Sequence, residues 1–268
     1  MKMIPLSTKS EFIKRMSSLI QRESNGAYPP EYSDLYSLYA NVRLRAAVAI
    51  LEIGSGWSTL ALAMGLYENC LSFGPQYVKE VRHPNPFTIL SLDASEKYLR
   101  IAHARVPTNW FVETNIRMVG QVSTPSMTTV SGKVCHTFEP LPSFTADFVY
   151  LDGPDCDQVL EDVNGFSVDF GASDQVISGQ VFPEHHYGLP MSADLLLIEH
   201  FFWPGSAIAV DGRGANASYL RSEFRRRWTY SYDKDLDQHW FELDDEPWGS
   251  VCASHLEIRR AARESLAG

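Results

Sequence analysis

The sequence has few of the features that mark disulfide-stapled, zinc-binding or nucleic-acid-binding proteins. Its four cysteines are scattered with no paired spacing, which argues against a zinc site or a disulfide framework and favours a reducing, cytoplasmic compartment. Only 23 lysines and arginines face 33 acids, and a net charge of -10 would repel the phosphates of a nucleic acid. Charged residues between Lys9 and Arg15 interrupt the start of the chain, so we expect neither a signal peptide nor a membrane span there, and no membrane partner.

The chain does contain enough apolar side chains for a large core. Hydrophobic residues make up 44% of it and charged residues 21%, as in an ordinary globular protein. The 268 residues suit one large α/β domain with an attached segment, or two small domains. We expect an N-terminal helical cap over residues 1–46, an α/β domain over 47–243 and a C-terminal tail over 244–268.

The most informative stretch is a short apolar run followed by two glycines. Residues 48–53 are rich in β-branched side chains and predict a buried parallel strand. Gly54 and Gly56 then allow a tight turn and a close approach of the backbone to a ligand, and a helix opens at Ser58. This order predicts a nucleotide-binding corner, although a glycine pair alone also fits a turn that binds nothing.

The third glycine of a dinucleotide-binding fingerprint is missing, because Thr59 stands in its place. Instead, Glu52 lies two residues before the first glycine. The pattern Glu-x-Gly-x-Gly-x-Ser resembles motif I of the class I S-adenosylmethionine-dependent methyltransferases. The resemblance implies that this turn holds the methionine half of the cofactor and that Glu52 helps to receive its ammonium group. The cofactor-binding residues predicted in the turn are Glu52, Gly54, Ser55, Gly56, Ser58 and Thr59.

A second strand, predicted over residues 87–93, ends in Asp93. Without an irregular insertion at residues 71–86, Asp93 follows Gly54 by about the 20 positions expected of an acid that binds ribose hydroxyls. A carboxylate can accept hydrogen bonds from both hydroxyls of a cis-diol. Asp93 could instead only cap the following helix, predicted over residues 95–105. Ala94 is placed beside the ribose, and Gly120, in a third strand over 116–122, is placed near the adenine by position alone.

Two further strands end in acids. Residues 146–151 predict a fourth strand that delivers Asp152 and Asp155 to the carboxyl edge of the sheet, and residues 207–211 predict a fifth that ends in Asp211. Four of the five predicted strands thus carry an acid at their ends, where open α/β sheets place their chemistry. We take Asp152, Asp155 and Asp211 as the candidate catalytic residues and Asp152 also as a cofactor contact, although Asp-Gly-Pro-Asp is also good turn chemistry.

The residues at the ends of the fourth and fifth strands also indicate whether the site binds a metal. A strand ending Leu-Asp-Gly resembles the fourth strand of many methyltransferases that act on hydroxyl groups, where the acid binds a divalent metal or contacts the acceptor. Catechol-type enzymes follow the fifth-strand acid with asparagine, whereas this chain has Gly212. We therefore favour a metal-free site and name Asp152 and Asp211 as the ligands if a metal binds. Two such carboxylates without a cation would repel, which raises one pKa and suits a general base. In this version we expect Asp152 to be the base or acceptor contact and Asp211 its polar neighbour.

The other predicted elements surround this edge of the sheet. They are helices over residues 8–22, 31–44, 57–69, 192–202 and 214–227, a hairpin over 126–138, and a closing antiparallel hairpin over 228–232 and 238–243. Residues 156–190 form a long excursion, which predicts a lid or binding loop. The candidate substrate contacts are His186, Arg213 and Asn216. The tail from Asp244 is expected to be irregular and then weakly helical from about Leu256.

The predicted fold is α/β and doubly wound, with a mostly parallel seven-stranded sheet whose last strand is antiparallel. The resemblance, to an O-methyltransferase-like bacterial branch, spans roughly residues 34–243. It implies methyl transfer from S-adenosylmethionine to an oxygen of a small molecule or sugar, by direct displacement. Two alternatives stay open: a nicotinamide-dependent oxidoreductase, and a ligand-binding protein that kept this fold without turnover. Whether the chain forms a homodimer is open as well.

Overall fold

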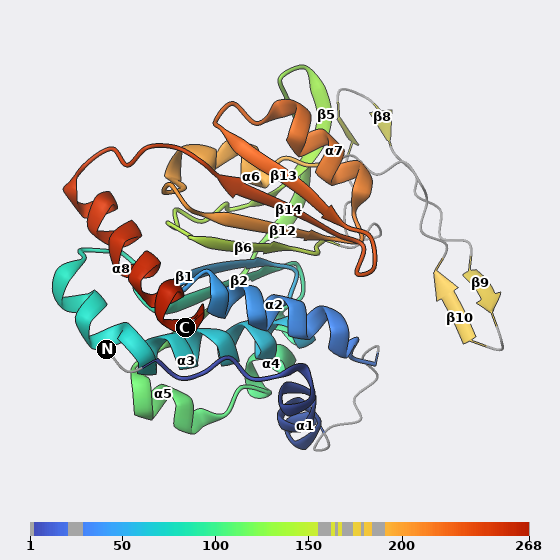
Figure 1. The fold of residues 1–268 in the computed structure, drawn as a ribbon. Helices are drawn as coiled ribbons and strands as arrows, with labels where there is room; N and C mark the ends of the chain where they lie inside the picture. The colour runs from blue at the N-terminus through green and yellow to red at the C-terminus, as the bar shows by residue number, and fades with distance from the viewer. Residues whose placement is uncertain are drawn as a thin grey trace.

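The computed structural model describes residues 3–20, 29–154 and 191–267, together with the backbone of four short strands between residues 155 and 190. Within these residues the central sheet has seven strands. Their order across the sheet (Figure 1) is β13 (Trp228–Asp233), β14 (Gln238–Leu243), β12 (Ala207–Asp211), β6 (Phe148–Leu151), β1 (Ala49–Ile53), β2 (Thr88–Asp93) and β3 (Arg117–Val122). Only β14 runs antiparallel to its neighbours within this sheet, which confirms the predicted fold class.

Helices cover both faces of the sheet, as Figure 1 shows. Ile50 of β1 packs into a core cluster with the helices on one face, whereas Leu51 and Ile53 pack into a second cluster on the other face. Successive side chains of a strand point to opposite faces, and both faces are covered here. Every residue of β1 is therefore buried. The helices of the first face are α1 (Lys9–Ile20), α2 (Tyr32–Leu44), α3 (Trp57–Glu80) and α8 (Ser250–Ala267); those of the second are α6 (Asp194–Leu197) and α7 (Gly214–Glu223).

The remaining described elements lie beside these layers. Helix α4 (Glu96–Ala104) packs against β2 and β3, and α5 (Thr108–Thr114) packs against α3. The predicted inserted hairpin is confirmed as β4 (Thr124–Val130) and β5 (Lys133–Glu139), with β11 (Met191–Ser192) parallel to β5. The short strands of the excursion are β7 (Asp162–Val163), β8 (Phe166–Ser167), β9 (Asp174–Ile177) and β10 (Gln180–Pro183).

Helix α3 is longer than the sequence predicted. We expected an irregular insertion from residue 71, but the helix continues to Glu80 with Pro75 inside it. A proline removes one backbone hydrogen bond from a helix. Phe73 and Tyr77, both buried in the core, lie on either side of it and pack against Phe87, and these contacts favour continuation of the helix.

The helices around β12 are shorter than predicted. The expected helix over 192–202 is divided into β11, the single turn α6 and a 3₁₀ turn, Glu199–Phe201, and α7 ends at Glu223 instead of 227. The Glu199 carboxylate explains the second difference, because it accepts hydrogen bonds from the backbone N–H groups of Arg225 and Arg226 at 3.0 and 2.9 Å. These amides therefore bond outside α7.

The C-terminal segment is a packed helix that begins at Ser250, so the expectation of a helix from about Leu256 is confirmed and that of an irregular tail is wrong between residues 250 and 255. Arg259 is 3% exposed and donates to the carbonyl oxygens of Arg45 and Ala46, at 2.9 and 3.1 Å. His255 is fully buried and hydrogen-bonds to the Tyr77 hydroxyl at 2.7 Å. These contacts hold α8 at the edge of the sheet opposite the carboxyl ends of β1 and β6.

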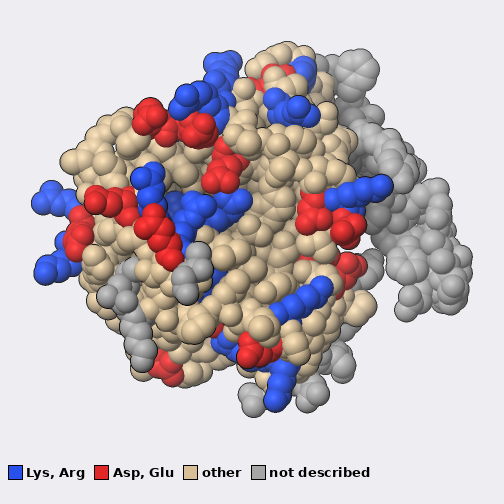
Figure 2. Space-filling view, viewed as in Figure 1, with Lys and Arg blue, Asp and Glu red and all other residues tan. Residues whose placement is uncertain are grey.

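Neither the helices of the described ranges nor the charges on the face that Figure 2 shows mark a membrane-spanning segment or a surface of one sign. No helix in these ranges is both long and apolar enough to cross a bilayer. On the face drawn in Figure 2, acidic and basic side chains are interspersed over the surface.

Candidate active site

A cleft of about 600 Å³ opens at the carboxyl ends of four neighbouring strands, β2, β1, β6 and β12. Its walls include Asp93, Asp152 and Asp211, which stand at or just after the ends of their strands. The structure thus brings three of the four predicted strand-end acids to one cavity. The turn after β1 and the start of α2 also line the cleft.

Two glycines let the turns after β1 and β6 touch backbone to backbone. Gly54 has a φ of +89°, and a Cβ there would lie 2.8 Å from the backbone of Asp152. A Cβ on Gly153 would lie 2.7 Å from the Gly54 Cα. Such distances are too short for any side chain, so this contact requires glycine at both positions. At Gly56 the nearest atom is the Ser58 Oγ at 3.9 Å, which leaves room for a ligand beside the turn.

Asp93 joins this turn to the next strand. Its Oδ2 accepts hydrogen bonds from the Ser55 N–H at 2.8 Å and from the Ser55 hydroxyl at 2.6 Å, and its Oδ1 accepts from the Ser95 N–H at 2.7 Å. The side chain of Ser95, and not Asp93, caps α4. Asp93 and Ala94 both line the cleft, beside the glycine turn.

Glu52 lies behind the turn and outside the walls of the cleft, fully buried. Its carboxyl group accepts hydrogen bonds from the hydroxyls of Ser58, Thr59 and Ser91 at 2.7, 2.8 and 2.6 Å. Burial raises the pKa of Glu52 to about 7, although the three hydroxyls act in the other direction. Glu52 therefore fixes the first turn of α3 and does not reach a ligand in the cleft. The Thr59 hydroxyl is hydrogen-bonded to Glu52 and does not face the cleft either.

The raised pKa of Glu52 predicts a pH dependence of stability. Below about pH 4.5 the carboxyl is protonated in both states, and between about pH 4.5 and 7 the unfolded chain loses this proton first. Stability should fall through this window, by roughly 3 kcal/mol from this group. Glu52→Gln keeps the shape without the charge and should flatten the slope, measured as the free energy of unfolding in urea from pH 4.5 to 7.5.

The slope in the variant should not vanish altogether. Burial also raises the pKa of Asp194 to about 6 and that of Asp34 to about 7, and both remain in Glu52→Gln. An unchanged slope in Glu52→Gln would contradict the assignment to Glu52.

Asp152 and Asp211 are linked by Tyr150, a residue that the sequence analysis did not single out. The Tyr150 hydroxyl donates to Asp211 Oδ2 at 2.6 Å and lies 3.4 Å from Asp152 Oδ2. Burial raises the pKa of Asp211, and hydrogen bonds from Tyr150 and Gln238 lower it. Alternation along β6 could have identified Tyr150, because it shares a strand face with Asp152.

Three more acids line the same cleft, again unforeseen. Glu31 and Asp34 come from the start of α2, and Asp237 from the turn between β13 and β14. The pKa of Asp34 is raised to about 7 by burial first, then by a hydrogen bond with the Glu31 carboxyl and by the charge of Asp211. The sequence gives no sign of where α2 packs, so it could not have placed these residues in the cleft.

The remaining residues that the sequence predicted as ligand contacts make other contacts in the structure. The Arg213 guanidinium donates to the Asp152 carbonyl at 3.0 Å, and Asn216 accepts from the Ser192 N–H at 2.7 Å, so Asn216 holds β11. Gly120 lies within β3, where its α-carbon faces His103. None of these three lines the cleft. Asp155 and His186 lie outside the described residues.

The described residues offer no ready-made metal site. No three histidine, cysteine, aspartate or glutamate side chains among them are grouped as metal ligands. The O–H of Tyr150 lies between Asp152 and Asp211, the two ligands predicted if a metal binds. Magnesium needs six oxygen ligands in near-octahedral array, which this pair does not supply.

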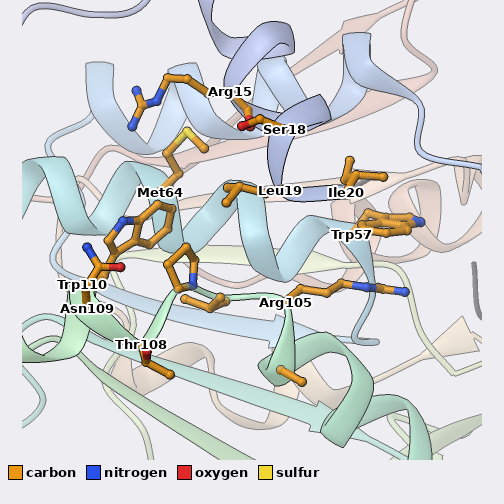
Figure 3. Close-up of a pocket in the computed structure, with 13 residues that line it drawn as sticks. Arg15, Ser18, Leu19, Ile20, Trp57, Met64, Arg105, Thr108, Asn109 and Trp110 are labelled. Carbon is orange, nitrogen blue, oxygen red and sulfur yellow. The ribbon is translucent and has the colours of Figure 1, made fainter. Parts of the chain in front are cut away.

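A second hollow, of about 590 Å³, adjoins the cleft between α1, α3 and α5 (Figure 3). Trp57 and Arg105 line both hollows, with the guanidinium 3.5 Å above the indole ring. In Figure 3, Arg15 extends from α1 on one side and Trp110 from α5 on the other. The Trp57–Arg105 pair is therefore a shared wall.

No protein-family model and no curated protein matches this chain. Among solved structures it is similar to the O-methyltransferase from Bacillus cereus in complex with SAH, at 16% identity and a TM-score of 0.41, over 90% of this chain and 93% of that one. It is also similar to the O-methyltransferase TomG from Streptomyces achromogenes, involved in tomaymycin synthesis, in complex with SAM, at 12% identity and a TM-score of 0.40, over 88% and 90%. A third is the SAH-bound methyltransferase PaMTH1 from Podospora anserina, at 14% identity and a TM-score of 0.42, over 90% and 99%. Structural similarity at these identities and TM-scores does not assign an activity to this chain. Its function is therefore inferred from the residues of its own cleft.

Proposed function

We propose that this chain is an S-adenosylmethionine-dependent methyltransferase that acts on an oxygen of a small molecule or sugar. The observation that carries the proposal is the glycine corner, in which the turn at Gly54–Gly56 packs against Gly153 and is held by Asp93 beside a cleft of about 600 Å³. S-adenosylmethionine, when bound, supplies an electrophilic methyl group on a sulfonium ion. The open backbone at Gly56 would hold its methionine half, and Asp93 would accept from its ribose hydroxyls.

The charge of the cleft supports this cofactor. Six acids and one arginine are found among the described residues of its walls. S-adenosylmethionine carries two positive groups, an ammonium and a sulfonium, which such a cleft attracts. Because Glu52 is buried, we assign the ammonium to Asp152, whose side chain is 51% exposed at the end of β6. Arg213 donates to the Asp152 carbonyl, and its Nε lies 3.7 Å from Asp152 Oδ1, so Arg213 orients that residue from one side.

Asp211 is the group we assign as the general base. Its pKa is raised by burial, as a base for a hydroxyl requires, and the Tyr150 hydroxyl fixes the orientation of its carboxylate. As the acceptor oxygen takes the methyl group, its proton passes to Asp211 and a neutral thioether is left. Most of the acceleration comes from holding the two reactants in line. This version needs no metal, and loss of activity in EDTA with recovery on adding magnesium or manganese would overturn it.

The first test is binding of S-adenosylhomocysteine and of NAD by calorimetry, on the native chain and on Asp93→Ala. We expect S-adenosylhomocysteine to bind and NAD not to bind. Asp93→Ala removes a charged acceptor of two hydroxyls and should weaken binding by a few kcal/mol, at about 1.5–3 per such bond. Glu96→Gln, an exposed acid on α4 nearby, is the control and should bind normally.

Three results would count against the proposal. Tighter binding of NAD than of S-adenosylhomocysteine would favour the oxidoreductase alternative. Unchanged affinity in a folded Asp93→Ala variant would remove the ribose assignment. Binding of the cofactor without methyl transfer to any acceptor pool would favour a non-catalytic protein with this fold.

A further inference from the structure

The cleft has two ends of different character. One end, formed by Gly54–Gly56, Asp93 and Ala94, is where we place the cofactor. The other end we name the acidic half-cleft: four carboxylates, Glu31, Asp34, Asp211 and Asp237. The single arginine among the described wall residues, Arg105, is stacked on Trp57, and neither belongs to the acidic half-cleft.

The carboxyl groups of the acidic half-cleft act on one another within one cavity. Burial, and then the charges of Asp211 and Glu31, raise the pKa of Asp34; burial, and then the charges of Glu31 and Asp237, raise the pKa of Asp211. The Tyr150 hydroxyl donates to Asp211 in a 2.6 Å hydrogen bond. An ammonium group placed among these carboxylates would offset their mutual repulsion and donate its N–H groups to them.

Within the described ranges, the cation that acts on Asp34 is Lys9, which lies outside the walls of the cleft. The excursion at residues 156–190 contains six acids and neither lysine nor arginine, so it can bring no such cation to the cleft. Nor are the acids of the described ranges grouped to hold a metal ion. A larger, organic cation fits better, because apolar side chains stand beside the acids in the walls: Leu35, Leu38, Phe138 and Leu236.

We propose that the methyl acceptor is a hydroxyl-bearing small molecule with an apolar body and a protonated amine, and that Glu31, Asp34 and Asp237 of the acidic half-cleft bind this amine while Asp211 stays free for the hydroxyl. The inference rests on the proposed function and names its substrate class. The amine keeps its charge and is not methylated. The acceptor oxygen forms the bond to the methyl carbon as the sulfur–methyl bond breaks, and the hydroxyl proton passes to Asp211.

The test uses three phenols of similar size and different charge: tyramine, p-cresol and 4-hydroxyphenylacetate. Their dissociation constants are measured on protein saturated with S-adenosylhomocysteine, by ligand-observed NMR. We expect the cation tyramine to bind about tenfold more tightly than the neutral and the anionic phenol, because several carboxylates act on one charge. Asp34→Asn and Asp237→Asn should each reduce this preference several-fold. Asp235→Asn, an exposed acid in the same turn as Asp237 and outside the cleft walls, should keep it.

The two proposals fail in different ways. If S-adenosylhomocysteine does not bind, the proposed function fails before any phenol is added. If it binds and p-cresol or 4-hydroxyphenylacetate binds as tightly as tyramine, or none of the three binds, the acidic half-cleft does not select a cationic acceptor. Retention of the full preference in both Asp34→Asn and Asp237→Asn would also overturn the inference. Asp237 lies in an exposed turn, so its variant remains a test if Asp34→Asn does not fold.

Discussion

Gly153→Ala should abolish measurable binding of S-adenosylhomocysteine and should also lower the stability of the fold. The added Cβ would lie 2.7 Å from the Gly54 Cα and 2.9 Å from the Gly54 nitrogen. Both are backbone atoms, so no side chain can rotate to make room. The turns after β1 and β6 would have to separate, although the strands before them are hydrogen-bonded neighbours. Overpacking of this kind costs about 1–3 kcal/mol or more, and here it also displaces the cofactor turn.

The matched variant is Gly56→Ala, which adds the same methyl group two residues after Gly54. Its Cβ would meet only the Ser58 Oγ, at 3.9 Å, so the free energy of unfolding should stay near that of the native chain. Urea unfolding measures stability and calorimetry measures affinity. Native affinity in Gly153→Ala would show that the contact between the two turns is not needed to form the site. Equal destabilisation by both variants would show that the effect is not specific to that contact.

The acids of the site show what the sequence could and could not predict. Asp93 and Asp211 are the last residues of their strands and Asp152 follows its strand, so all three reach the cleft. Glu52 is followed by Ile53 within β1, so it lies inside the sheet and is fully buried. A difference of one residue in where a strand ends decides whether an acid meets solvent or the core, and the apolar run alone does not fix that boundary.

Contacts between distant segments account for most of what was missed. Asp34 enters the cleft because α2 packs along α3, which no local pattern in residues 31–44 reveals. The helical pattern of α8 is weakened because two of its buried positions, His255 and Arg259, are polar. Their partners come from α3 and from the end of α2, far away in the chain. The central strands β1, β2, β6 and β12 were predictable because a buried parallel strand is itself a short apolar run.

Asp211→Asn should lower kcat by about 10²–10⁴ while the affinity for S-adenosylhomocysteine stays unchanged, because it removes a general base and keeps the shape of the side chain.

Tyr150→Phe tests the group that positions this base. The Tyr150 hydroxyl stabilises the ionised form of Asp211 through a 2.6 Å hydrogen bond, and this contact lowers the pKa of Asp211. Without it the pKa rises, a smaller fraction of Asp211 is ionised at a given pH, and the acidic limb of the pH profile of kcat/KM should move to higher pH. The measurement is transfer of a labelled methyl group to the acceptor that such labelling identifies. Tyr67→Phe removes another hydroxyl bonded to a carboxylate, that of Glu113, outside the cleft walls, and its profile should match the native one. A loss of rate in Tyr150→Phe that is uniform at all pH values would assign Tyr150 a structural role only.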